Sequence, residues 1–153
     1  MNIIQCFFNR FKIKQKLKIK LIHADAKIPF KADDGCAGYD VFSTESIQIY
    51  PRTRKLISTG LSTEFSNRYY LRIAPRSGLS VKGIDIGAGV IDSSYRGEIK
   101  VVMINNSEIL YSVEKGTKIA QLIMESCENV EIEISDSLSN SSRGDGGFGS
   151  TGN

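Results

Sequence analysis

A period of two in the apolar residues constrains the fold of this chain more than any other feature. From Phe11 to Leu21, lysines alternate with phenylalanine, isoleucine, leucine and one glutamine. This pattern is typical of a β-strand with one apolar face, and lysines on the other face also protect an exposed sheet edge. Further runs rich in isoleucine, valine, tyrosine and threonine predict strands at 46–50, 54–61, 68–74, 98–105, 109–113, 118–125 and 129–134. Because no window holds a helical repeat for long, we expect an all-β sandwich or jelly roll.

The length of the chain fits one folded domain. With 153 residues, of which 41% are hydrophobic, the chain can bury a core of its own. We expect residues 1–16 to form a basic N-terminal extension and residues 17–134 to form the β domain. Residues 135–153 are rich in glycine and serine, and we expect them to form a flexible C-terminal arm.

Charge and cysteine usage narrow the classes of partner. Residues 1–20 carry six of the 20 basic residues and no acid, which leaves 14 basic against 17 acidic residues in the rest. A body with a small negative charge argues against a nucleic-acid partner. The three cysteines are scattered and show no CxxC spacing, so we expect neither a disulfide framework nor a zinc site. These features predict a reducing compartment, the cytoplasm or the nucleus.

The N-terminal segment does not favour export or membrane insertion. No stretch reaches the roughly twenty apolar residues that a membrane span needs, so we expect no membrane partner. The apolar start precedes the basic residues, which is the wrong order for a secretory signal. The basic residues are mostly lysines and no serine precedes Ser43, so a mitochondrial presequence is less favoured.

The chain has a single histidine, His23. One histidine near the start excludes the usual Ser-His-Asp arrangement and a multi-histidine metal site. We expect His23 to be a strand residue without a chemical role. A general base would then be a carboxylate, and a metal would be held by oxygen.

Two segments offer groups that suit phosphate oxygens. Arg76, Ser77 and Gly78 follow a predicted strand and present a guanidinium, a hydroxyl and free amides at a tight turn. An ordinary β-turn with a surface arginine is the alternative. Gln121 lies among strand apolar residues, where a buried amide has to be hydrogen-bonded, so we expect it to face a site or a subunit contact.

A third segment combines glycines with an acid and an aromatic ring. The glycines at 87 and 89 let the backbone approach a ligand closely. Asp92 follows two apolar residues, so we expect partial desolvation of its carboxylate, and Tyr95 comes three residues later. A plain β-hairpin with an aspartate in its turn is the alternative.

The C-terminal segment from Arg143 to Asn153 holds five of the fourteen glycines, an arginine, an aromatic ring and two adjacent hydroxyls. Glycine amides, a guanidinium and hydroxyls suit a polyphosphate, and Phe148 could cover a base. A P-loop is excluded, because no lysine follows the glycines and no helix can start there. The segment predicts a clamp that orders over a nucleotide; a disordered Gly/Ser tail is the alternative.

Taken together, these segments resemble the homotrimeric dUTP pyrophosphatases (dUTPases). The five motifs of that family occur in order as AGYDVFS, PRSGLS, GVIDSSYRGE, KGTKIAQLI and RGDGGFGSTG, within residues 17–152. The resemblance implies a jelly-roll homotrimer with three active sites, each built from motifs of all three subunits. It also implies attack of a water on the α-phosphorus of Mg²⁺-bound dUTP, which releases dUMP and pyrophosphate. Such an activity limits uracil in DNA and supplies dUMP for thymidylate synthesis.

The resemblance also assigns roles to individual residues. Asp92 would orient and activate the water as general base, a role worth about 10²–10⁴-fold. Tyr95 would lie against the deoxyribose and leave no room for a 2′-hydroxyl. The remaining assignments are the backbone of Gly89, Val90 and Ile91 with the main chain of Lys100 for uracil; Arg76, Ser77, Gly78 and Gln121 for the α- and β-phosphates; Arg143, Gly149, Ser150 and Thr151 in the arm, of which Arg143 and the two hydroxyls reach the terminal phosphates; Phe148 for stacking on uracil; and Asp40 for Mg²⁺, through water only.

One position departs from the family pattern, and two other functions compete. The family usually carries a second acid two residues after the catalytic aspartate, where this chain has Ser94. A dCTP deaminase of the same fold would need a glutamate ten residues after that aspartate, where this chain has Val102. A non-catalytic nucleotide-binding trimer is the other alternative, but such a protein need not keep Asp92, Tyr95 and Arg143.

Overall fold

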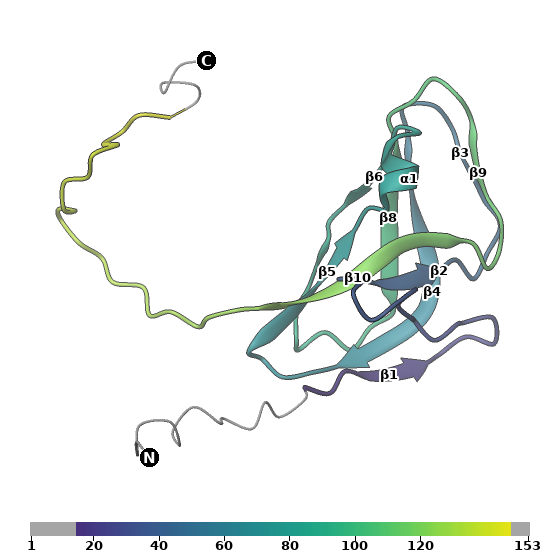
Figure 1. The fold of residues 1–153 in the computed structure, drawn as a ribbon, viewed down its shortest axis with the longest axis horizontal. Helices are drawn as coiled ribbons and strands as arrows, with labels where there is room; N and C mark the ends of the chain where they lie inside the picture. Colours follow the sequence, from purple (N-terminus) through teal and green to yellow (C-terminus); the bar gives the residue numbers. More distant parts are fainter. Residues whose placement is uncertain (1–14, 148–153) are drawn as a thin grey trace, which may run out of the picture.

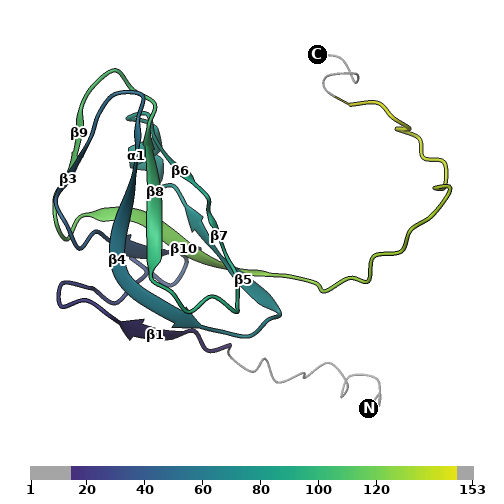
Figure 2. The same ribbon diagram turned by 180° about the vertical axis from the view of Figure 1, so that it is seen from behind.

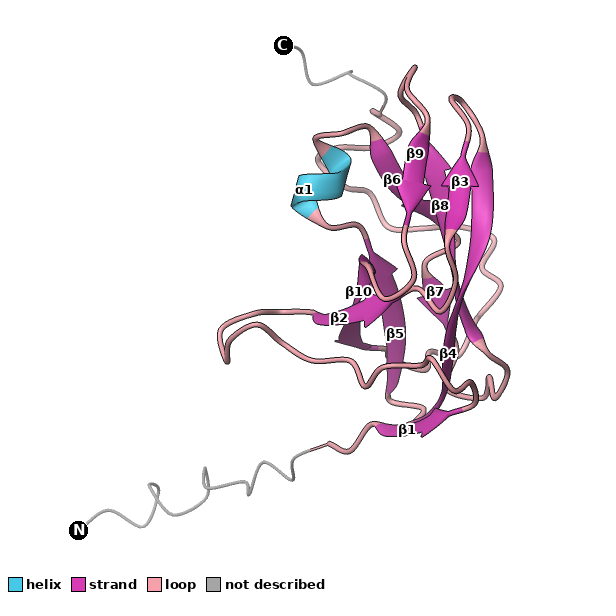
Figure 3. Cartoon of the chain, turned by 90° about the vertical axis from the view of Figure 1, so that its right-hand side faces the viewer, coloured by secondary structure: helices cyan, strands magenta, loops and turns pink. Residues whose placement is uncertain are grey.

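The structure, a computed structural model, describes residues 15–147, and most of its regular secondary structure is β-strand (Figure 1). The strands are β1 (Lys18–Leu21), β2 (Tyr39–Phe42), β3 (Ile47–Ile49), β4 (Arg54–Glu64), β5 (Tyr69–Ala74), β6 (Ile84–Gly87), β7 (Val90–Ile91), β8 (Ile99–Asn105), β9 (Tyr111–Val113) and β10 (Lys118–Ser126). The short helix α1 (Ser77–Ser80) lies between β5 and β6, as Figure 3 shows. The all-β architecture predicted from the sequence is confirmed.

The strands form two four-stranded antiparallel sheets and a two-stranded ribbon. The first sheet has the order β1-β4-β8-β6, the second has the order β2-β10-β5-β7, and β3 pairs with β9 (Figures 1 and 2). Alternate residues of these strands point inward and form one hydrophobic core. Its fully buried side chains include Ile57, Leu61, Ile99 and Val101 from the first sheet and Val41, Leu71 and Leu122 from the second.

The strand predicted at 129–134 is wrong for the single chain. β10 ends at Ser126, and residues 127–134 are exposed and outside any strand. The alternation is nevertheless present, since Val130, Ile132 and Ile134 are 78%, 89% and 95% exposed. A strand needs a neighbour to satisfy its backbone groups, and residues 15–147 supply none for this segment.

Other differences concern short elements. Only Lys18–Leu21 of the alternating segment 11–21 forms a strand within the described residues. β2, β6, β7 and α1 were not predicted, because runs of two to four residues carry too little periodicity to be recognised. His23, expected in a strand, lies in the bend after β1, where its Nδ1 accepts a hydrogen bond from the Asp25 amide at 3.1 Å. No helix among the described residues has the length and hydrophobicity that a membrane crossing requires.

Candidate active site

The segment from β6 to β7 connects the two sheets at their edges; we call it the hairpin below, although its two strands pair with different sheets and not with each other. β6 pairs with β8 in the first sheet, whereas β7 pairs with β5 in the second, and Ala88 and Gly89 make the passage between them. The Ile73 amide donates a hydrogen bond to the Gly89 carbonyl at 2.7 Å, which fixes the hairpin against β5. The sequence segment that begins at Gly87 therefore follows one sheet, crosses, and continues into the loop that carries Asp92.

A cavity of about 310 Å³ opens beside this hairpin. It brings together most of the residues predicted to meet the nucleoside and the attacking water: Val90, Ile91, Asp92, Tyr95 and Lys100. Gly89 directly precedes Val90 in the chain but does not itself line the cavity. The wall is completed by Leu56, Ile73, Ala88, Glu98, Ile99 and Val102, so the lining is mostly apolar and includes three charged residues, Asp92, Glu98 and Lys100.

Asp92 and Tyr95 are the first and last residues of one tight turn. The Tyr95 amide donates a hydrogen bond to the Asp92 carbonyl at 3.1 Å, and the Tyr95 hydroxyl donates to the Glu98 carbonyl at 3.1 Å. Asp92 is exposed and Tyr95 is 47% exposed. The expected partial desolvation of Asp92 is therefore not present in the single chain.

A second cavity, of about 440 Å³, gathers the residues predicted to hold phosphate and metal. Asp40, Arg76, Ser77, Gly78 and Gln121 line it. Their convergence follows from the second sheet, because the end of β5 lies beside β10, and β10 lies beside β2. The wall is completed by Ala32, Cys36, Gly38, Leu79 and Lys82.

Asp40 lies between two cations in this cavity. Its Oδ1 is 3.1 Å from Arg76 Nε, its Oδ2 is 2.8 Å from Lys118 Nζ, and its side chain is only 14% exposed. Gln121 donates from Nε2 to the Pro75 carbonyl at 2.9 Å, so this half-buried amide is hydrogen-bonded as expected, and its side chain lines the cavity. Asp40 thereby orients the two basic side chains, and the cavity retains donors for an anion.

The part of the C-terminal arm that the structure describes, residues 135–147, lines neither cavity in the single chain. Residues 127–145 are exposed, and the arm extends away from the sheets (Figures 1 and 2). Arg143 donates from Nε to the Gly146 carbonyl at 2.8 Å and contacts none of the other predicted site residues. Phe148, Gly149, Ser150 and Thr151 lie outside the described residues.

The segments that line the two cavities are also the ones that match known proteins. The family model described as dUTPase matches residues 24–152, which is most of the chain and includes all five motifs. The chain belongs to the dUTPase family.

Individual relatives agree with this membership. The deoxyuridine 5'-triphosphate nucleotidohydrolase of Vaccinia virus (strain Copenhagen) is 50% identical over 127 residues, which cover 83% of this chain and 86% of that protein. The Saccharomyces cerevisiae protein of the same name is 47% identical over 139 residues, or 90% of this chain and 95% of that protein. A solved Staphylococcus bacteriophage 80alpha dUTPase variant with dUpNHpp has a TM-score of 0.85 at 28% identity, covering 90% of this chain and 98% of that chain. The jelly-roll fold of this chain is thus the fold of the dUTPase family.

Several residues of this dUTPase-family chain line or border the cavities without having been predicted. Among them, Lys82 and Lys118 add cations to the second cavity, and Ala88 and Glu98 belong to the wall beside Tyr95. Glu98 ends the GVIDSSYRGE motif and Lys118 lies inside KGTKIAQLI, so their place in the motifs was a usable signal. Lys82 and Ala88 carry no such signal, because their approach depends on the path of the chain after α1 and through the hairpin.

Proposed function

We propose that this chain is a dUTP diphosphatase, which hydrolyses dUTP to dUMP and pyrophosphate. The observation that carries this proposal is the gathering of Asp92, Tyr95 and the β7 backbone around one cavity, in a chain that also has a second, donor-rich cavity. In the proposed reaction, Asp92 accepts a proton from a water as that water attacks the α-phosphorus, and pyrophosphate leaves with the bond electrons. An exposed carboxylate suits this role, because a water molecule can reach it and transfer a proton to it.

The cavity beside the hairpin fits a deoxynucleoside. Its apolar lining can accept the uracil ring. Those backbone groups of Gly89, Val90 and Ile91 that do not pair with β5, with the main chain of Lys100, can read the base edge. Tyr95 stands at the mouth, where an aromatic ring packed against the sugar leaves no space for a 2′-hydroxyl. The apolar lining suits a pyrimidine base, and the Tyr95 ring favours a deoxyribonucleoside over a ribonucleoside.

The second cavity fits the phosphate chain. Arg76, Ser77 and Gln121 supply a guanidinium, a hydroxyl and an amide, with the Gly78 amide beside them and Lys82 close by. Charge-assisted hydrogen bonds of this kind are about twice as strong as neutral ones. We assign this cavity to the α- and β-phosphates, and we assign Arg143, Ser150 and Thr151 of the arm to the terminal phosphates, with Phe148 over the base.

The separation of the two cavities supports assembly. They share no lining residue, so a single chain presents the base and the phosphate donors in different places. A homotrimer in which one subunit supplies the hairpin, another the phosphate cavity and a third the arm would complete three sites. The exposed alternation of Val130, Ile132 and Ile134 supports the same idea, because an unpaired strand-like segment can add to the sheet of another subunit.

Magnesium fits the phosphate cavity only as a companion of the substrate. Residues 15–147 contain no group of three or more side chains that could hold a metal ion. Each Asp40 oxygen faces one cation and keeps a lone pair that can accept from a water of the ion's shell. Mg²⁺ commonly retains waters and binds substrate phosphates, and it would supply charge neutralisation there. A bacteriophage phi11 dUTPase variant with a structural Mg(II) ion shares the fold at a TM-score of 0.77 and 23% identity.

A substrate panel tests the proposal directly. Pyrophosphate release would be measured with dUTP, dCTP, dTTP and UTP at equal concentrations with Mg²⁺. We expect rapid release from dUTP alone. Deamination of dCTP would instead indicate the deaminase alternative, and binding of dUTP without turnover would indicate a non-catalytic nucleotide-binding trimer.

A further inference from the structure

The long strand β4 contains a bulge opposite the start of β8. Ser58 pairs with Lys100 and Leu61 pairs with Ile99, so Thr59 and Gly60 are extra residues in β4. Gly60 has a φ of +67°, and a β-carbon there would lie 2.7 Å from the β-carbons of Ala26 and His23. A bulge removes backbone groups from the strand pairing, and these groups need other partners.

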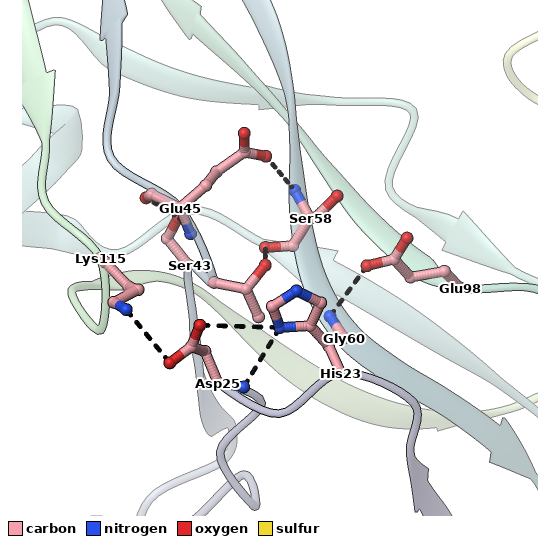
Figure 4. A network of polar contacts seen from close by, with 9 residues as sticks. His23, Asp25, Ser43, Glu45, Ser58, Gly60, Glu98 and Lys115 are labelled. Carbon is pink, nitrogen blue, oxygen red and sulfur yellow. Dashed lines mark hydrogen bonds and ion pairs between the residues drawn. The ribbon is translucent and has the colours of Figure 1, made fainter.

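Glu98 satisfies the amide that the bulge frees. The Gly60 amide donates to Glu98 Oε1 at 2.9 Å, a contact that Figure 4 shows reaching from the loop to β4. Glu98 Oε2 lies 3.5 Å from Lys100 Nζ, and the Glu98 side chain is 23% exposed. A carboxylate that accepts from a backbone amide at a fixed bulge holds its own backbone in place.

That backbone is what Tyr95 contacts. The Tyr95 hydroxyl donates to the Glu98 carbonyl at 3.1 Å, so the ring folds back along the loop. Gly97 makes this possible, because a β-carbon at position 97 would lie 2.4 Å from the Tyr95 hydroxyl. The orientation of the ring therefore depends on a glycine beneath it and on a carbonyl whose residue is tied to β4.

The rest of the loop is tied down beside the same bulge. The Ser62 hydroxyl donates to the Arg96 carbonyl at 2.8 Å, and the Thr59 hydroxyl donates to the Ile99 carbonyl at 2.5 Å. Arg96 in turn donates from Nη1 to the Ser93 carbonyl at 2.6 Å. β4 thus holds the loop at residues 96, 98 and 99, directly after the span that carries Asp92 and Tyr95.

From these contacts we propose that Glu98 is a positioning residue for sugar selection: by bonding the bulge amide of Gly60 it fixes Tyr95 in the orientation that excludes a 2′-hydroxyl. The inference rests on the proposed function of Tyr95 and deepens it. Glu98 itself contacts the substrate in no step. Its effect is on the ratio of deoxyribonucleotide to ribonucleotide binding, which a purely structural residue would leave unchanged.

The test measures dissociation constants for dUMP and UMP by calorimetry on the full-length protein. Loss of the anchor in Glu98→Ala should lower the preference for dUMP over UMP by about tenfold, mainly through tighter UMP binding. Glu98→Gln keeps an oxygen acceptor for the Gly60 amide and should retain the preference. Gly97→Ala, which displaces the ring and leaves the Gly60 contact intact, should lower it as Glu98→Ala does. Glu108→Ala, an exposed acid paired with Arg52 elsewhere, is the matched control.

The possible results distinguish a failure of the inference about Glu98 from a failure of the proposed function. An unchanged dUMP preference in folded Glu98→Ala or Gly97→Ala would overturn the inference, and so would an equal loss in Glu98→Gln. If Glu98→Ala does not fold, the inference is tested by the dUMP preference of Gly97→Ala, which should fall, and of Glu98→Gln, which should not. A wild-type protein that prefers dUMP but releases no pyrophosphate from dUTP would contradict the proposed function while leaving the positioning role of Glu98 supported.

Discussion

Gln121 packs directly onto the backbone of Gly38, so that a β-carbon at position 38 would lie 2.4 Å from Gln121 Oε1 and 2.9 Å from its Cβ. Gly38 directly precedes β2, and Gln121 lies in the neighbouring strand β10. Both residues line the second cavity. The position of the Gln121 amide thus depends on the absence of a side chain at residue 38.

Gly38→Ala should displace Gln121 and weaken phosphate binding without changing the chemical step. The loss of one hydrogen bond to a charged group corresponds to about a tenfold rise in KM for dUTP, with kcat nearly constant. Steady-state kinetics measures this effect. Asn67→Ala, at an exposed position in the turn between β4 and β5, is the control. A normal KM in folded Gly38→Ala would show that Gln121 does not hold phosphate.

Asp92→Asn should abolish most turnover and leave binding almost intact. The amide keeps the shape of the side chain but cannot accept the proton of the attacking water, so kcat should fall at least about 100-fold. Single-turnover kinetics and dUTP binding together measure both quantities. Asp85→Asn, at an exposed aspartate of β6 in the same hairpin, should behave as wild type. Near-normal turnover of Asp92→Asn would remove this residue from the mechanism.

Mixed assemblies test whether each site is shared between subunits. One chain carries Asp92→Asn. The other is truncated after Ser142 and so lacks the part of the arm from Arg143 onward. Neither should be active alone, but verified mixed trimers should recover part of the activity, because intact hairpin and intact arm then meet in some sites. Absence of recovery would indicate that each site is built from a single chain.

The sequence predicted the longer strands well because their side chains face one common core. The runs at 54–61, 68–74, 98–105 and 118–125 correspond closely to β4, β5, β8 and β10. The extension of β4 to Glu64 was missed, since Ser62, Thr63 and Glu64, which follow the bulge at Thr59 and Gly60, are all polar and show no apolar alternation. Periodicity alone also could not separate a strand that pairs within the chain from one that does not, which is why 129–134 was misassigned.

For the site, the motifs predicted which residues gather but not how they are held. Arg76, Ser77 and Gln121 converge as expected, whereas the pairing of Asp40 with both Arg76 and Lys118 could not be read from their spacing. Such contacts depend on strand register across the second sheet, which is a property of three-dimensional packing.

The exposed alternation after β10 leads to a prediction about assembly. If Val130, Ile132 and Ile134 cover apolar surface of a neighbouring subunit, Ile132→Asp should shift the trimer towards smaller species, because it places a charge in that contact. Sedimentation velocity over a range of protein concentrations measures the shift. Glu133→Gln, at the adjacent position on the opposite side of the segment, should leave assembly unchanged. An unaffected trimer in Ile132→Asp would show that this segment is free in the assembled protein.

Acid sensitivity is predicted from a contact between β5 and β10. The Tyr70 hydroxyl donates to Glu125 Oε2, and Arg72 Nε lies 2.6 Å from Glu125 Oε1. These two contacts hold the pKa of Glu125 below its ordinary value of about 4.5.

Because the folded-state pKa of Glu125 is the lower one, the ionised carboxylate stabilises the fold above about pH 4.5, and this contribution is lost as the pH falls through the folded-state pKa. Glu125→Gln should therefore lower Tm at pH 7 and show a shallower fall of Tm below pH 4.5 than wild type. Thermal melts between about pH 3 and pH 7 measure this difference. Glu131→Gln, in the exposed segment that follows β10, is the control. Parallel Tm profiles for wild type and Glu125→Gln below pH 4.5 would show that other carboxylates determine the acid limit, since only a group with a lower pKa in the fold than in the unfolded chain can steepen that limb.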